Sequence, residues 1–138
     1  MLSLAMTEKA PSKRQFLLHM LTGSPGDCME AAKKIIGGQI PTDHRTLAKI
    51  GRDKSLEVWP RIAAIYALGL LGERKFADAL GNIVADRTDD LAVRSHAAEA
   101  LGNLGNKDIT GVLRDVLRGK PPKELREACT YALGELRA

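Results

Sequence analysis

One segment occurs three times along this chain at nearly constant spacing, and it constrains the fold more than any other feature. Its copies read RIAAIYALGLLG from Arg61, RSHAAEALGNLG from Arg94 and REACTYALGEL from Arg126. The starts of these copies are 33 and 32 residues apart. A period of this length is typical of proteins in which small units stack and bury a continuous core between neighbours. The sequence therefore predicts a short array of stacked units rather than a domain built around one central core.

Each unit is expected to contain two helices. In the repeated segment, apolar residues fall at the spacing of one helical face, and we call this the A helix. Its face in the best copy is Val93, Ala97, Ala100, Leu101 and Leu104. A second segment, the B helix, recurs between the A helices. Its repeated apolar pairs are Leu47 and Ile50, Leu80 and Ile83, and Leu113 and Val116.

The fold class that follows is all-α, an α-α superhelix of about three and a half helical hairpins with an N-terminal helix. Aromatic residues make up 4% of the chain and apolar residues 44%, which argues against a β fold and against disorder. We expect a flexible leader over 1–11 and a single repeat domain over 12–138. The expected helices lie near 12–22, 27–37, 42–54, 56–71, 74–86, 90–104, 107–118 and 122–137.

Local signals mark the ends of these helices. Gly72 and Gly105 stand where A helices should end, which favours left-handed caps at both. Candidate residues for capping the starts of helices are Thr42, Ser55 or Thr88, and Asp108. The chain ends on an A helix without a following B helix, so we expect an open edge there that another protein or a second copy could cover.

The segment from Val93 to Gly105 resembles the short HEAT-like repeat of phycobilin lyases, and the resemblance extends over residues 27–138. It implies a scaffold used for many functions. Deoxyhypusine hydroxylase is a HEAT-like enzyme that resembles the same segment and places His-Glu pairs at the heads of its A helices to bind iron. Here the pair positions read Ile62-Ala63, Ser95-His96 and Glu127-Ala128, and the chain contains no His-Glu dipeptide. The residues therefore argue against that activity. HEAT-like DNA glycosylases offer no aligned set of aromatic and carboxylate residues either.

The candidate binding surface combines exposed basic positions of the B helices with the few aromatic side chains. The B helices of such arrays conventionally line the concave face, and the aromatic residues are typical of contact sites between proteins. The candidate residues are Arg45, Lys49, Arg52, Asn82, Arg114, Arg118, Trp59, Tyr66 and Tyr131. Cys28 and Cys129 fall on the core face of A helices and predict buried thiols without a disulfide or metal role.

These observations predict a non-catalytic scaffold or adaptor that binds another protein, with no cofactor, no metal and no catalytic residue. Two alternatives remain at this point: a phycobilin-lyase-like chromophore chaperone, and a module that binds nucleic acid. The net charge of +4 hints at nucleic acid, but acidic residues interrupt the basic positions, so such a partner is not expected. No apolar run is long enough for a membrane span, and we expect a cytoplasmic protein.

Overall fold

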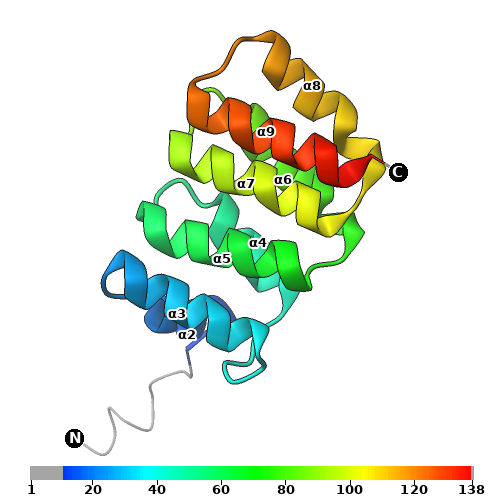
Figure 1. The fold of residues 1–138 in the computed structure, drawn as a ribbon. Coiled ribbons are helices and arrows are strands. Elements are labelled where there is room, and N and C mark those ends of the chain that lie inside the picture. The colour runs from blue at the N-terminus through cyan, green and yellow to red at the C-terminus, as the bar shows by residue number, and fades with distance from the viewer. Residues whose placement is uncertain (1–10, 138) are drawn as a thin grey trace, which may run out of the picture.

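The computed structural model describes residues 11–137, and its helices confirm the α-α superhelix. Figure 1 shows two layers, one formed by α3, α5, α7 and α9 and the other, behind it, by α2, α4, α6 and α8. The helices are α2 (Lys13–Met20), α3 (Pro25–Ile36), α4 (His44–Arg52), α5 (Val58–Leu71), α6 (Ala77–Ala85), α7 (Leu91–Leu104), α8 (Thr110–Arg118) and α9 (Lys123–Leu136). Short 3-10 turns, η1 (Arg74–Phe76) and η2 (Lys107–Ile109), lead directly into α6 and α8.

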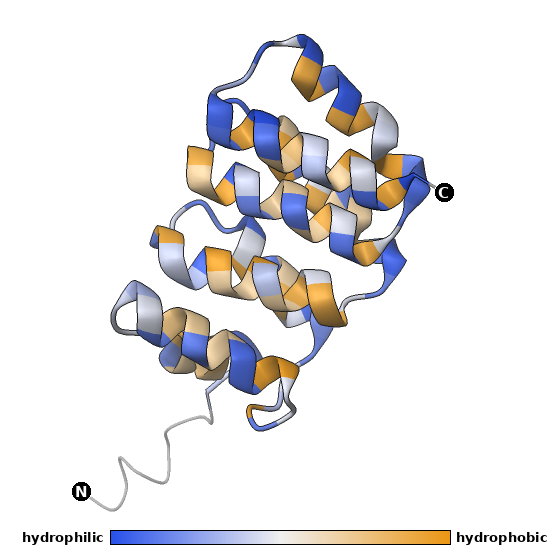
Figure 2. Ribbon diagram, viewed as in Figure 1, coloured by the Kyte–Doolittle hydropathy of each residue, from blue (hydrophilic) through white to orange (hydrophobic). Residues whose placement is uncertain are grey.

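The core lies between the two layers and continues from one unit to the next. Helices in both layers alternate hydrophobic and hydrophilic residues, as Figure 2 shows, and the apolar side chains meet in the middle. The predicted A-helix face of α7 is buried throughout, and so is the B-helix pair Leu80 and Ile83 of α6. The repeat spacing thus predicted the core correctly because a helical face is a local property of the sequence.

Glycine allows neighbouring A helices to approach closely. A Cβ atom on Gly69 would lie 2.7 Å from the Cβ of Ala100 in α7, and one on Gly102 would lie 3.0 Å from the Cα of Ala132 in α9. Gly134 occupies the same repeat position in the last helix, and a Cβ there would meet nothing within 4 Å. The Leu-Gly pair of the repeat therefore serves helix stacking wherever a further A helix follows.

A buried ion pair ties one unit to the next. Arg61 of α5 is 3% exposed and Asp89, in the loop before α7, is 4% exposed. Nη1 and Nη2 of Arg61 donate to the two oxygens of Asp89 at 2.8 and 2.7 Å, and Nε donates to the carbonyl of Gly51 at 3.1 Å. The Arg61 guanidinium, which donates to both oxygens, holds the pKa of Asp89 below its usual range.

The helix ends differ from the sequence-based expectation in several places. Gly105 has φ 75° and forms the expected left-handed cap, but Gly72 has φ −70° and does not. Glycine is needed at position 72 for a steric reason, because a Cβ atom there would lie 2.3 Å from the carbonyl oxygen of Leu68. Ser12 and Ser24 cap α2 and α3. Asp43, Asp90 and Asn106 cap α4, α7 and η2, each one or two positions from the predicted Thr42, Thr88 and Asp108. The predicted Ser55 does not cap α5, which starts after Glu57 without a side-chain cap.

The expected leader over 1–11 lies outside the described residues except for Pro11, so its flexibility stays a prediction. No helix within residues 11–137 combines the length and the apolar character that crossing a membrane requires.

Candidate functional site

The structure distributes the predicted binding residues over both layers. The basic and polar candidates lie exposed on the layer of α4, α6 and α8. The three aromatic candidates lie on α5 and α9, in the other layer, with Trp59 37% and Tyr131 46% exposed and Tyr66 partly buried. The predicted residues are therefore not brought together in one place. Their role in binding a partner stays a prediction, as does a partner at the edge formed by α9.

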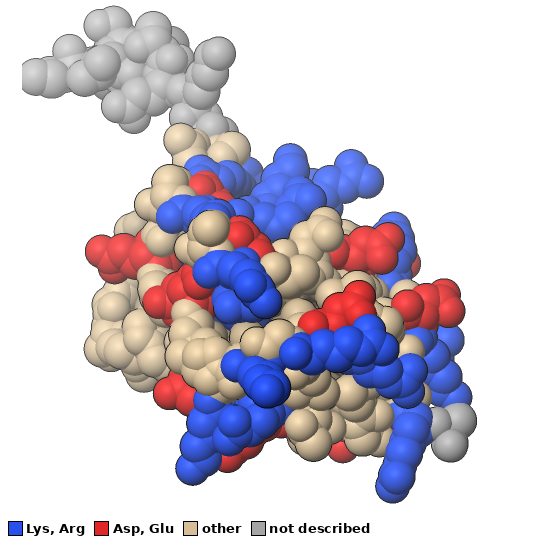
Figure 3. All heavy atoms as spheres, turned by 90° about the horizontal axis from the view of Figure 1, so that it is seen from above, with Lys and Arg blue, Asp and Glu red and all other residues tan. Residues whose placement is uncertain are grey.

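Charge is mixed on the end of the molecule formed by α8 and α9. Figure 3 views this end and shows Lys and Arg side chains alternating with Asp and Glu rather than forming a continuous basic band. The ion pair of Arg118 with Asp115 belongs to this surface. A hollow with more basic than acidic residues lies at α2 and α4. Its charged lining is Lys13, Arg14, Arg45, Lys49 and Lys75 with Asp43 and Glu73.

A second hollow lies between the N-terminal halves of α7 and α9, and we call it the α7–α9 hollow. It contains both pair positions of the hydroxylase resemblance, Ser95-His96 from α7 and Glu127-Ala128 from α9. Stacking of adjacent A helices brings these positions together, although they are 32 residues apart in the sequence. The complete lining is Ala92, Ser95, His96, Glu99, Glu124, Glu127, Ala128 and Tyr131.

The polar side chains of the α7–α9 hollow are partly exposed. His96 is 32% exposed, and its Nδ1 lies 3.9 Å from Oε2 of Glu99, which is 50% exposed. The ring of Trp59 meets the His96 ring edge-on, with centroids 6.4 Å apart. The hydroxyl of Tyr131 donates to Oδ1 of Asn103 at 3.2 Å, which fixes the tyrosine ring beside the hollow. Three carboxylates, Glu99, Glu124 and Glu127, give this surface an acidic character.

The residues of the α7–α9 hollow do not fit the iron ions that the hydroxylase resemblance implies. Iron sites of this kind need several imidazole and carboxylate ligands that converge. Of the two pair positions, only His96 and Glu127 could be ligands, because Ser95 donates its hydroxyl to the carbonyl of Leu91 and Ala128 has no ligand atom. Within residues 11–137, no three His, Cys, Asp or Glu side chains come close enough to hold a metal ion.

The two cysteines lie in the core, as their helix positions predicted. Both thiols are buried and unpaired within the described chain. Burial raises the pKa of Cys129 to about 11 and also raises the pKa of Cys28. Such thiols are poor nucleophiles, because the thiolate is the reactive form.

The α7–α9 hollow could not be recognised as a site from the sequence alone. The pair positions were considered only as possible metal ligands. Of the candidate binding residues, Tyr131 lines this hollow and Trp59 contacts His96, whereas the basic candidates lie on the B helices. The one sequence feature that could have indicated this site is the group of acidic residues near these pairs, Glu99, Glu124 and Glu127. That signal becomes meaningful only when α7 and α9 are known to lie side by side.

Comparison with known proteins identifies relatives that are enzymes. A protein of Drosophila pseudoobscura pseudoobscura named deoxyhypusine hydroxylase is 31% identical over 104 residues, which are 75% of this chain and 33% of that protein. Proteins with the same name from Debaryomyces hansenii and Mus musculus are 33% and 32% identical over 72 and 71 residues. These matches cover 52% and 51% of this chain and 23% of each relative. The chain thus spans a quarter to a third of the length of these relatives.

These relatives correct the functional part of the sequence analysis. The prediction of a non-catalytic scaffold, and with it both the chromophore chaperone and the nucleic-acid module, conflicts with relatives that are named as enzymes. The likeness to phycobilin lyases holds only at the level of the repeat, since the relatives found are hydroxylases. The absence of the His-Glu pairs was wrongly taken as evidence against any relationship to an enzyme.

The repeat itself is recognised independently of these relatives. Residues 45–134 match the family of HEAT repeats, and this match covers α4 through most of α9. The matched region contains the glycine contacts between A helices and the Arg61–Asp89 ion pair that join its units. By this match and by its two layers of stacked helices, the chain belongs to the HEAT repeat family.

Proposed function

We propose that this chain takes part in the enzymatic modification of a protein side chain, and that its contribution is to bind a diamine side chain of the deoxyhypusine type in the α7–α9 hollow. The observation that carries the proposal is the position of three carboxylates in the α7–α9 hollow of a chain that is similar to proteins named deoxyhypusine hydroxylase. No step of the reaction is assigned to a metal held by this chain.

The chemistry of the substrate named by these relatives suits an acidic hollow. Deoxyhypusine is a lysine side chain extended by an aminobutyl group, so it carries one secondary and one primary amine. Both amines are protonated at neutral pH, where glutamate side chains are ionised. A side chain with two positive charges along its length can therefore meet more than one of Glu99, Glu124 and Glu127, whereas lysine offers one charge.

Two further residues would shape such binding. Lys123 lies 3.9 Å from Glu127 through Nζ and Oε1, so it competes with a bound amine for this carboxylate. The ring of Tyr131 offers an aromatic face at the edge of the hollow, and ammonium groups bind favourably over such faces. Glu127 is 65% exposed, so each ion pair contributes modestly and weakens as salt is added.

The direct test is a binding titration with two peptides that differ at one residue, deoxyhypusine in one and lysine in the other. We expect the deoxyhypusine peptide to bind about two- to fivefold more tightly, as one additional exposed ion pair would give. The difference should decrease with rising salt. Equal affinities for the two peptides at low salt would refute the proposal.

Matched variants locate the binding. Glu127→Gln should reduce the preference for the deoxyhypusine peptide, and Lys123→Gln should increase it by removing the competing cation. Glu135→Gln is the control, because Glu135 is an exposed glutamate of the same helix that does not line the hollow. If Glu135→Gln changes the preference as much as Glu127→Gln does, binding depends on overall charge rather than on this site.

A further inference from the structure

Arg94 of α7 repeats the environment of Arg61 without its ion-pair partner. The two arginines occupy the same position in successive A helices, 33 residues apart. Nε of Arg61 donates to the carbonyl of Gly51, and Nε of Arg94 donates in the same way to the carbonyl of Val84 at 3.0 Å. Arg94 is only 9% exposed, and its terminal nitrogens, which have no hydrogen-bond partner within residues 11–137, reach solvent.

The missing partner has a clear origin in the sequence. Asp89 directly precedes Asp90, the residue that caps the start of α7, and Pro121 directly precedes Pro122 at the start of α9. Pro121 thus stands where an aspartate would complete the pair with Arg94. Among residues 11–137, no carboxylate forms a salt bridge or a hydrogen bond with the Arg94 guanidinium.

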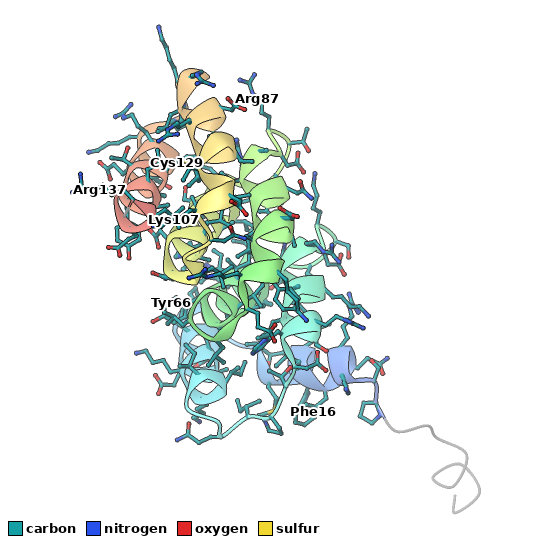
Figure 4. All side chains as sticks on the ribbon, turned by 90° about the vertical axis from the view of Figure 1, so that its right-hand side faces the viewer. Phe16, Tyr66, Arg87, Lys107, Cys129 and Arg137 are labelled. Carbon is teal, nitrogen blue, oxygen red and sulfur yellow. The ribbon has the colours of Figure 1, made fainter. Side chains whose placement is uncertain are left out.

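The Arg94 guanidinium lines an open hollow together with other cations, and we call this the Arg94 hollow. Arg87 and Lys120 also line it. A Cβ on Gly119 would lie 2.7 Å from Nη2 of Arg87, so Arg87 extends across the gap to the end of α8. Figure 4 shows Arg87 beside that end of α8. One carboxylate, Asp115, shares the lining, but it is 72% exposed and pairs with Arg118.

We infer that the Arg94 hollow is a binding site for a carboxylate group supplied by a ligand. The Arg61–Asp89 pair is the template, because there a carboxylate accepts two parallel hydrogen bonds from Nη1 and Nη2 of the corresponding arginine. An external carboxylate can occupy the corresponding place at Arg94, where the chain leaves the fork open. Arg87 and Lys120 add positive charge, and the Nε hydrogen bond to Val84 holds the Arg94 guanidinium in place, unlike that of a mobile surface arginine.

Succinate is a suitable probe, and NMR signals of the arginine Nε–H groups report on each site separately. Both Arg61 and Arg94 hold Nε–H in a hydrogen bond to a backbone carbonyl, so both signals should be observable. We expect succinate to shift the Arg94 signal in a saturable way and to leave the Arg61 signal unchanged, because Asp89 already occupies that fork. Succinamide, which has the same shape without the charges, should shift neither.

Two variants complete the test. Pro121→Asp supplies the missing carboxylate from the chain itself, so it should move the Arg94 signal without ligand and abolish the effect of succinate. Arg87→Gln retains Arg94 and should weaken succinate binding about two- to fivefold, because it removes one exposed cation from the hollow. The inference is overturned if succinate leaves Arg94 unmoved, if it shifts Arg61 equally, or if Pro121→Asp still binds succinate as the unmodified chain does.

Discussion

At the scale of single residues, the Arg61–Asp89 pair is the contact with the largest expected effect on stability. Removing one member of a buried ion pair leaves the other charge without compensation, which typically costs 3–5 kcal/mol. Asp89→Asn should therefore lower the free energy of unfolding by about 3 kcal/mol. Asp115→Asn is the control, since its carboxylate pairs with Arg118 on the surface, and it should change stability by less than about 0.5 kcal/mol. Similar losses in urea titrations of the two variants would contradict this assignment.

The same pair predicts a dependence of stability on pH. The folded-state pKa of Asp89 lies below its unfolded value, which is about 3.9 for an ordinary aspartate. Its stabilising contribution is therefore present above about pH 4 and is lost as pH falls through the lower, folded pKa. The difference in unfolding free energy between the unmodified chain and Asp89→Asn should be constant near neutral pH and shrink in acid. A difference that grows as pH falls would show that the sign is wrong.

Some features at the residue scale could be predicted from the sequence, and others could not. The helical faces could be predicted because their spacing is local. The partner of Arg61 could not, because it lies 28 residues away in a loop whose position depends on the stacking of two units. The acidic lining of the α7–α9 hollow was missed for the same reason. The missing His-Glu pairs were read correctly from the sequence, but the enzymatic relationship was not.

At the scale of helices, the Leu-Gly position of the repeat provides three chemically identical tests. Gly69→Ala and Gly102→Ala should each destabilise the chain by about 1–3 kcal/mol, because the new methyl group meets the backbone or Cβ of the next A helix. Gly134→Ala should stabilise it by about 0.5–1 kcal/mol, because alanine favours helix and open space surrounds that position. Thermal unfolding of the three variants measures the contrast, and equal effects at all three positions would refute this account of stacking.

Most ends of the helices were predicted within two residues. The starts of α6 and α8 were predicted three residues too early, because the chain enters both helices through the 3-10 turns η1 and η2. The apolar residues Phe76 and Ile109 lie in these turns and still contact the core, so they continued the apolar pattern without being part of the α-helix. Apolar spacing alone does not distinguish such a turn from the first turn of a helix.

At the scale of the whole molecule, the linear arrangement of units predicts a gradient of local stability. Within residues 11–137, the middle helices α5 and α7 have an A-layer neighbour on both sides, whereas α9 has one on one side only. In repeat arrays each unit is stabilised chiefly by its neighbours. Backbone amides of α5 and α7 should therefore exchange with deuterium more slowly than those of α9. Exchange that is equally slow in all three helices would indicate a single cooperative unit instead.

The proposed binding site in the α7–α9 hollow exists only where two units meet, so it depends on the assembled array. Its most direct test is a backbone amide NMR titration of the full chain with the deoxyhypusine peptide and, separately, with the lysine peptide. The account predicts saturable shifts concentrated around His96, Glu99 and Glu127 that are larger and appear at lower concentration with deoxyhypusine. Shifts confined to the layer of α4, α6 and α8, or identical titrations with the two peptides, would contradict it.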